Sequence, residues 1–385
     1  MFSLAHMILD GANGTELQRR GMPPGCCGEQ WILAHPEAEL DIQRRYVEAG
    51  STAILAPTFG ANRISLGHHG LGDSVRDYNL RLVALSRQAA DGRALVGGDL
   101  SPTGLCCGSV EPALFDRVKA AFREQARALE EADVDFFMVE TQISLAEAKA
   151  TVLAIREVSD KPIMVSFTMT PSGKTLSGGE IASALLTLEP LGIAAFGINC
   201  VDDAELIACK LTELRSLTNL PLLVQANAGL PQTVEGKSVY SMSPAQMAAD
   251  AKRYYDCGAD IFGSCCGSNA EHIRVIAQTV GALPVRAHKG DILPRLCSEY
   301  RYLPMDAERR EATLTDWENW EEELEQIEEE GAELLRLRID TREQLDALLN
   351  QQASFRMPLS VRFSDSSLKN VFSDYYIGLA DLVNE

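Results

Sequence analysis

The segments AFGINC at residues 195–200 and IFGSCC at residues 261–266 decide the fold. Each is an apolar run of strand length that ends in cysteine, and an uninterrupted apolar run is typical of a parallel strand buried on both faces. The two segments place Cys200, Cys265 and Cys266 at strand ends. If both strands belong to one barrel, the three thiols lie at the same end of it, where they can form a metal site with an open fourth position.

The rest of the chain up to about residue 280 repeats one unit, a short apolar run followed by an amphipathic helical segment. The expected strands are residues 7–10, 53–58, 95–100, 136–140, 162–167, 195–200, 222–227 and 261–266. The expected helices lie near residues 37–49, 73–90, 113–132, 144–158, 179–188, 202–217, 243–256 and 269–280. Eight such units favour a closed (β/α)8 barrel, the TIM barrel, over an open sheet. We therefore predict this α/β barrel for residues 1–288.

Polar side chains follow nearly all of the expected strands. In a (β/α)8 barrel the carboxyl ends of the strands form the catalytic face. The residues at these ends are Asp10, Thr58, Asp99, Glu140, Asn199, Cys200, Asn227, Cys265 and Cys266. Their shared position predicts an enzyme with its active site at that end of the barrel.

Three cysteines at strand ends favour zinc with one open position, because a structural zinc normally takes all four ligands from the protein. Zinc bound by three thiolates can hold a fourth thiol as a nucleophilic thiolate, which suits S-alkylation. Cys265 and Cys266 can both reach the metal only if the chain turns at the strand end. We expect Gly263 and Gly267 to permit that turn. The alternative is ordinary buried thiols, since free cysteine is often buried.

Seven motifs resemble, in the same order, those of the homocysteine S-methyltransferase family, and most closely the homocysteine-binding module of cobalamin-dependent methionine synthase. They are LDGANGTELQ (9–18), PTFGANR (57–63), VET (139–141), TLSG (175–178), GINC (197–200), NAGLP (227–231) and GSCCG (263–267). The resemblance implies that Cys200, Cys265 and Cys266 bind zinc and are the catalytic centre that activates the substrate thiol.

The resemblance also implies how homocysteine is held. Asp10 and Glu140 are expected to receive its α-amino group, and the backbone around Gly11, Thr58 and Phe59 its carboxylate. A buried ammonium needs anionic partners to offset its desolvation, which agrees with this division. The alternatives are a turn-forming role for Asp10 and a buried ion pair with a framework arginine for Glu140.

Two asparagines at strand ends are further candidates for the substrate site. Asn199 and Asn227 can fix the cysteine loop or line the pocket, or they can only satisfy backbone groups. The pairs Cys26-Cys27 and Cys106-Cys107 follow strands on the same face, and we interpret them as incidental loop thiols.

Composition excludes several other classes. The net charge of −20 and the pI near 4.8 argue against binding to nucleic acid, which requires clustered Lys and Arg. No apolar run approaches the roughly 18–20 residues that span a bilayer, and the N-terminus lacks a signal-peptide pattern, so we expect no membrane contact and a cytoplasmic location. The ten cysteines are too few for a disulfide scaffold.

The last part of the chain, residues 289–385, is expected to form a small acidic α/β extension. Residues 316–330 are strongly acidic and read as an amphipathic helix with Trp317, Trp320, Leu324 and Ile327 on its apolar face. A strand at 334–339, a helix at 341–349 capped by Thr341, and a strand at 357–363 follow. A packing or dimer-capping role and a role in meeting a donor protein are both open, and so is the oligomeric state.

The predicted reaction is zinc-dependent methyl transfer to the thiolate of L-homocysteine, which gives L-methionine. The methionine-synthase-like NAGLP segment and the extension favour a methyl-corrinoid (methylcobalamin) protein as donor and partner. S-methylmethionine, S-adenosylmethionine or a betaine are the alternative donors, and another thiol is the alternative acceptor. A non-catalytic zinc-binding interaction protein is the rival from a different class.

Overall fold

The computed structural model describes residues 4, 6–105, 111–230, 232–234, 237–305 and 308–383. Its larger part is a curled parallel sheet with the strand order β1-β2-β3-β4-β5-β6-β9. The strands are β1 (Ala53–Leu55), β2 (Leu95–Leu100), β3 (Phe136–Gln142), β4 (Ile163–Phe167), β5 (Ala195–Asn199), β6 (Leu222–Ala226) and β9 (Ile261–Ser264). All neighbouring pairs are parallel, as the continuous apolar runs predict.

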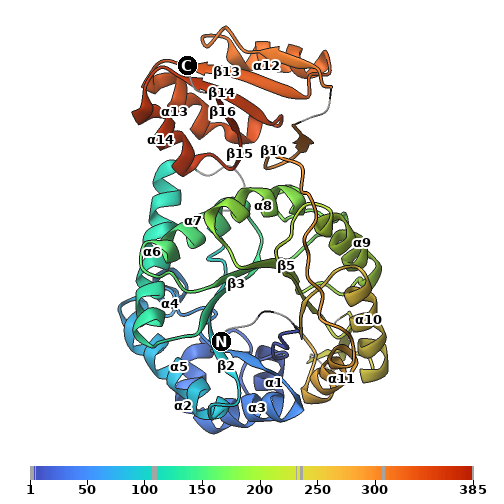
Figure 1. Cartoon of the computed structure of the whole chain (residues 1–385). Coiled ribbons are helices and arrows are strands. Elements are labelled where there is room, and N and C mark those ends of the chain that lie inside the picture. Colours follow the sequence, from blue (N-terminus) through green and yellow to red (C-terminus); the bar gives the residue numbers. More distant parts are fainter. Residues whose placement is uncertain are drawn as a thin grey trace.

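Residues 7–10 close the ring between β9 and β1. Ile8 forms a parallel bridge with Phe262, and the Leu9 N–H donates to the Phe262 carbonyl at 2.7 Å. On the other side the Thr52 N–H donates to the Ile8 carbonyl at 2.8 Å. The segment therefore occupies the place of the expected first strand, and the predicted (β/α)8 barrel is confirmed. Figure 1 looks into this ring, with the helices outside the strands.

The eight expected helices surround the sheet. They are α3 (Pro36–Ala49), α5 (Val75–Ala90), α6 (Pro112–Glu131), α7 (Leu145–Arg156), α8 (Ile181–Leu188), α9 (Ala204–Arg215), α10 (Pro244–Asp256) and α11 (Ala270–Gly281). The short helices α1 (Gly14–Arg19), α2 (Gly28–Ala34) and α4 (Arg63–Gly67) were not expected. They have five to seven residues, which is too few for an apolar period to be recognised. A hairpin of β7 (Gln232–Val234) and β8 (Lys237–Val239) follows β6.

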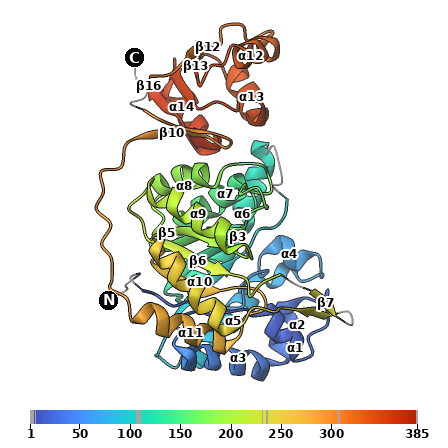
Figure 2. The same ribbon diagram turned by 90° about the vertical axis from the view of Figure 1, so that its right-hand side faces the viewer.

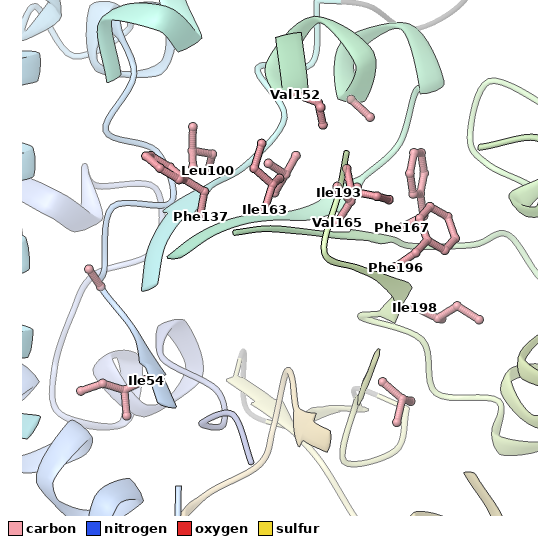
Figure 3. Packing of buried hydrophobic residues seen from close by; sticks show 14 of the residues in the cluster. Ile54, Leu100, Phe137, Val152, Ile163, Val165, Phe167, Ile193, Phe196 and Ile198 are labelled. Carbon is pink, nitrogen blue, oxygen red and sulfur yellow. The ribbon is translucent and has the colours of Figure 1, made fainter. Parts of the chain in front are cut away.

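Alternate strand residues fill two apolar layers. Phe136 and Met138 of β3 belong to the cluster inside the barrel, whereas Phe137 belongs to the layer between strands and helices. Figure 3 shows this outer layer, where Phe137 and Val165 lie below Val152 of α7. The Gly197 of the GINC motif is required here, because a Cβ on it would overlap the carbonyl oxygen of Leu223 in the neighbouring strand. The absence of a side chain at Gly197 thus lets β5 pair with β6 without a clash.

The chain after α11 runs along the outside of the barrel and then forms a second α/β unit (Figure 2). A parallel sheet of β12 (Glu311–Thr313), β13 (Leu334–Ile339), β14 (Leu359–Phe363) and β16 (Asp381–Val383) packs with α12 (Trp320–Glu329), α13 (Arg342–Asn350) and α14 (Ser366–Tyr375). A small antiparallel sheet of β10 (Arg295–Ser298), β11 (Tyr302–Pro304) and β15 (Gly378–Leu379) lies beside it. The unit has an apolar cluster of its own.

The two strands and the helix expected in the extension are observed as β13, β14 and α13, with bounds close to the expected ones. Thr341 caps α13 in a capping box with Gln344. The acidic helix begins later than expected, at Trp320. The reason is that the Asp316 side chain accepts the N–H groups of Glu318 and Asn319 and holds Trp317 in a turn before the helix. None of the described helices combines the length and the apolar character needed to cross a bilayer, and the cytoplasmic location stays a prediction.

A buried lysine joins the extension to the barrel. Lys149 of α7 is 4% exposed, and its Nζ donates to the carbonyls of Ser373 and Tyr376 at the end of α14, both at 2.8 Å. Burial lowers the pKa of Lys149 to about 8. The hydroxyl of Tyr375 adds a hydrogen bond to the Asp116 carboxylate of α6 at 2.9 Å. These polar contacts fix α14 against the barrel helices.

Replacing Lys149 by methionine keeps the apolar stem and removes both donors. We expect the free energy of unfolding to fall by about 1–3 kcal/mol, because the buried Tyr376 carbonyl and the Ser373 carbonyl both lose their partner. Denaturant titration measures this. The control is Lys252→Met, which removes an exposed pair with Asp256 and should cost less than about 1 kcal/mol. Equal losses in the two variants would contradict the structural role of Lys149.

Candidate metal and substrate site

Three cysteine thiols converge at the carboxyl ends of β5 and β9. Cys200 directly follows β5, and Cys265 and Cys266 directly follow β9. The sulfur of Cys266 lies 3.9 Å from that of Cys200 and 4.0 Å from that of Cys265. All three sulfurs lie within 4.8 Å of one another. In the described part of the chain this is the one cluster of three or more His, Cys, Asp or Glu side chains able to hold a metal.

The chain turns at the end of β9, as the use of two adjacent cysteines requires. The Ser268 hydroxyl donates to the Cys265 carbonyl at 2.8 Å, and Gly267 has a φ of +81°. The prediction for Gly267 is therefore confirmed, but the one for Gly263 is wrong. Gly263 lies inside β9, where a Cβ would come within 2.9 Å of the Leu9 Cβ, so it allows close packing rather than a turn.

The thiols differ in acidity. Hydrogen bonds from Cys200 and Cys265 lower the pKa of Cys266 to about 3. Hydrogen bonds with Cys200 and with Cys266 raise the pKa of Cys265 well above its usual range, and burial adds to that shift. The two neighbouring thiols therefore favour the ionised form of Cys266.

A cavity of about 430 Å³ opens beside the cluster. All three cysteines line it, together with Asp10, Gly11, Phe59 and Glu140 among the residues expected at the substrate site. The cavity thus contains the proposed metal ligands, the two expected acidic residues and part of the expected backbone. Its mouth carries Phe59, which is 42% exposed.

Three buried carboxyl groups face this cavity. Burial raises the pKa of Asp10 to about 8, although the Asp10 carboxylate accepts the Leu55 N–H at 2.9 Å. Burial, followed by the charge of Cys266, raises the pKa of Glu140 to about 7. Burial and the nearby charges of Glu140 and Asp10 raise the pKa of Asp99 well above its usual range. Among the described residues that line the cavity there is no Lys or Arg, and the alternative ion pair of Glu140 with an arginine is not observed there.

Asp99 and Glu29 also line the cavity. Asp99 was expected on the catalytic face but not in substrate binding, and Glu29 was not expected at the site. Asp99 was recognisable as a polar residue at a strand end, so its position was a usable signal. Glu29 belongs to the short helix α2 and carried no such signal. Its carboxylate accepts the Gly60 N–H at 2.7 Å and the Cys27 thiol at 3.4 Å.

Three expected site residues lie behind the cavity wall. Thr58 is fully buried, and its hydroxyl donates to the Asp99 carbonyl at 2.9 Å. Asn199 is fully buried, and its amide contacts Thr141. Asn227 is 9% exposed, and its Oδ1 has no hydrogen-bond partner among the described residues. The structure therefore brings the other expected residues together at the cavity and leaves these three around it.

Cys26 and Cys27 lie outside the three-cysteine cluster. Cys26 is exposed, Cys27 is buried against Glu29, and neither belongs to the metal-binding group. Cys106 and Cys107 lie outside the described residues. The interpretation of these four as incidental thiols stays a prediction.

Comparison with known proteins agrees with this geometry. A family model described as homocysteine S-methyltransferase matches residues 7–280. The methionine synthase of Mycobacterium leprae is 31% identical over 327 residues, which are 77% of this chain and 26% of the relative. The methionine synthase of Mycobacterium tuberculosis is 30% identical over 322 residues, again 77% of this chain and 26% of the relative. The chain thus spans about a quarter of the length of these relatives.

Solved structures support the fold. The homocysteine methyltransferase MmuM from Escherichia coli, in its metallated form, superposes with a TM-score of 0.61 at 23% identity. The match covers 71% of this chain and 96% of that protein. The family model covers well over half of the chain and includes both cysteine segments. The chain belongs to the homocysteine S-methyltransferase family.

Proposed function

We propose that this protein transfers a methyl group to the thiolate of L-homocysteine and so forms L-methionine, with zinc on Cys200, Cys265 and Cys266 and a methyl-corrinoid protein as donor. The observation that carries the proposal is the three-sulfur cluster at the wall of a cavity with buried acidic groups. The family supports the acceptor, since its model is that of homocysteine S-methyltransferases.

The spacing of the sulfurs fits zinc. A tetrahedral zinc with Zn–S bonds of about 2.3 Å has sulfurs about 3.8 Å apart. The observed separations from the sulfur of Cys266 are 3.9 Å and 4.0 Å. Zinc held by three thiolates supplies an open position at which a substrate thiol is activated as a thiolate nucleophile.

The acidic groups fit the amino group of homocysteine. Buried carboxylates are stable only with a cationic or hydrogen-bonding partner, and no described cavity-lining residue supplies a cation. An ammonium group between Asp10 and Glu140 would supply that partner, and Asp99 is close enough to add a third carboxyl. The thiol of the same ligand would then face the cysteine cluster across the cavity.

Fewer backbone N–H groups are free to bind the substrate carboxylate than the sequence suggested. Gly11 and Phe59 line the cavity, and neither N–H has a partner in the described part of the chain. The Thr58 N–H, in contrast, already donates to the Ala56 carbonyl at 2.7 Å. We therefore assign the substrate carboxylate to the N–H groups of Gly11 and Phe59, with Thr58 as a support.

Our choice of a methyl-corrinoid protein as the methyl donor rests on sequence similarity alone. The NAGLP segment at residues 227–231 resembles methionine synthase, and the curated relatives are methionine synthases. A donor screen tests this choice with zinc-loaded protein and homocysteine, comparing methylcobalamin, S-methylmethionine, S-adenosylmethionine and betaine. We expect methionine from methylcobalamin. Methionine from one of the small donors instead would move the assignment to that donor, and none from any donor would favour a non-catalytic zinc-binding protein.

Zinc binding is tested by replacing one ligand. The wild-type protein should retain about one zinc per chain after dialysis, and Cys266→Ser should bind zinc more than about tenfold more weakly, because a serine hydroxyl is a far poorer zinc ligand than a thiolate. Metal analysis and competition with a chelator measure this. Cys209→Ser is the matched control, since Cys209 is an exposed free cysteine of α9 and should leave zinc affinity unchanged.

Substrate binding should depend on pH through the cavity carboxyls. Because burial raises the pKa of Glu140 to about 7 and that of Asp10 to about 8, the two groups lose their protons between about pH 6 and pH 9. An ammonium group binds the ionised forms, so homocysteine affinity should rise over this range. Calorimetric titration at several pH values measures it.

The same titration assigns the role of Glu140. The variant Glu140→Gln should bind homocysteine at least about tenfold more weakly and with a flatter pH dependence, while zinc content is unchanged, because a charged partner of the ammonium is lost. Glu299→Gln is the control, since Glu299 is a half-buried carboxyl of the extension that accepts the Ser177 hydroxyl at 2.6 Å. Unchanged affinity in Glu140→Gln would remove Glu140 from the substrate site.

A further inference from the structure

We propose that Asn199 is a positioning residue that fixes Glu140 relative to Cys200, and so sets the distance between the site for the substrate ammonium and the site for its sulfur. The inference rests on the proposed function of the cavity. It assigns Asn199 no contact with substrate or metal, because the side chain lies behind the cavity wall.

The strand that carries Glu140 is irregular at that point. The pairing of β3 with β4 shifts between Val139 and Gln142, so that Glu140 and Thr141 form a bulge. Thr141 has a φ of +55°, which is a rare conformation for a β-branched residue. A bulge beside an active site can redirect a side chain, and here the side chain concerned is that of Glu140. Such a conformation persists only if neighbouring groups hold it.

Asn199 supplies these neighbouring groups from β5. Its Oδ1 accepts the Thr141 N–H at 3.0 Å, and its Nδ2 donates to the Thr141 hydroxyl at 2.7 Å. The same Oδ1 accepts the Ser166 hydroxyl of β4 at 3.0 Å. The amide therefore reaches across β4 to β3 and makes two bonds to the bulged residue.

The next residue along β5 is the metal-ligand candidate Cys200. It also has a left-handed backbone, with a φ of +56°, and its N–H donates to the Gln225 carbonyl at 3.0 Å. The Cys200 backbone is thus held independently by β6, while Asn199 ties the same strand end to the bulge. The Asn199 side chain, next to Cys200 in the chain, therefore bonds directly to Thr141, the residue that follows Glu140.

Asparagine is the residue type that fits this position. It offers an acceptor to the Thr141 N–H and a donor to the Thr141 hydroxyl at once. Aspartate keeps the acceptor but loses the donor, and it adds a negative charge near the buried Glu140. Alanine loses both bonds and leaves the Thr141 N–H without its partner.

The test separates positioning from folding with a substitution at Thr141. Thr141→Val keeps size and branching but removes the acceptor for Asn199, whereas Thr141→Ser keeps the hydroxyl. Thr151→Val is the control, because it removes a buried hydroxyl from α7 that donates to the Glu147 carbonyl at 2.8 Å. Homocysteine dissociation constant, zinc content and unfolding midpoint are measured for each, and for Asn199→Asp.

We expect Thr141→Val and Asn199→Asp to weaken homocysteine binding by roughly tenfold or more while zinc content stays at the wild-type value. Thr141→Ser should bind like the wild type, and Thr151→Val should change only the unfolding midpoint. Unchanged homocysteine affinity in both Thr141→Val and Asn199→Asp would overturn the proposal. If the wild-type protein itself bound neither zinc nor homocysteine, the proposed function would fail instead, so the two failures are distinguishable.

Discussion

The closure of the barrel between its first and last strands is the constraint on which the site depends. Asp10 ends the segment of residues 7–10 that takes the place of the first strand, and Cys265 follows β9, so the two are about as far apart in sequence as two barrel residues can be. The hydrogen bonds between Leu9 and Phe262, and from the Ser264 N–H to the Asp10 carbonyl at 3.1 Å, place them side by side. Without this closure Asp10 would not lie beside the cysteine cluster, and the cavity would lose one of its three buried carboxyl groups. The catalytic face of this fold is therefore a consequence of ring formation rather than of any local motif.

Much of the barrel could be predicted from the sequence because the same pattern of an apolar strand and an amphipathic helix repeats along the chain. The strands are continuous apolar runs separated by helical periods, and their observed bounds differ from the expected ones by a few residues. The cysteine trio was predictable for a similar reason, since Cys200 and Cys265 end two such runs. The short helices α1 and α2 were not predictable, because one or two turns give no apolar period. Glu29 was missed with them, since its place on the cavity wall depends on how α2 packs.

Other errors arose where a residue acts through a neighbouring strand. Gly263 was expected at a turn. Instead, the lack of a side chain at Gly263 allows Leu9 to pack closely against it, and this contact exists because the barrel closes. For Asn199 the sequence left three roles open, which were to fix the cysteine loop, to line the pocket or only to satisfy backbone groups. Its partner Thr141 lies two strands away, and the contact exists only because a bulge shifts the register of β3. Strand ends can be read from a sequence, but bulges and cross-strand partners depend on the packed sheet.

The electrostatics of the cavity explain why one ligand could satisfy both halves of the site. At neutral pH the raised pKa of Asp10, to about 8, means that its carboxyl group is largely protonated while the cavity holds no cation. When a substrate ammonium binds, Asp10 releases its proton and the ammonium takes over as its positive partner. The net charge of the buried site then stays the same, which limits the desolvation cost of binding. The cysteine cluster needs a positive partner as well, because the ionised form of Cys266 is anionic, and a bound metal ion would supply that charge. A molecule with an ammonium at one end and a thiol at the other is therefore matched at both ends, and a thiol without the ammonium would leave the buried carboxyl groups without a cation.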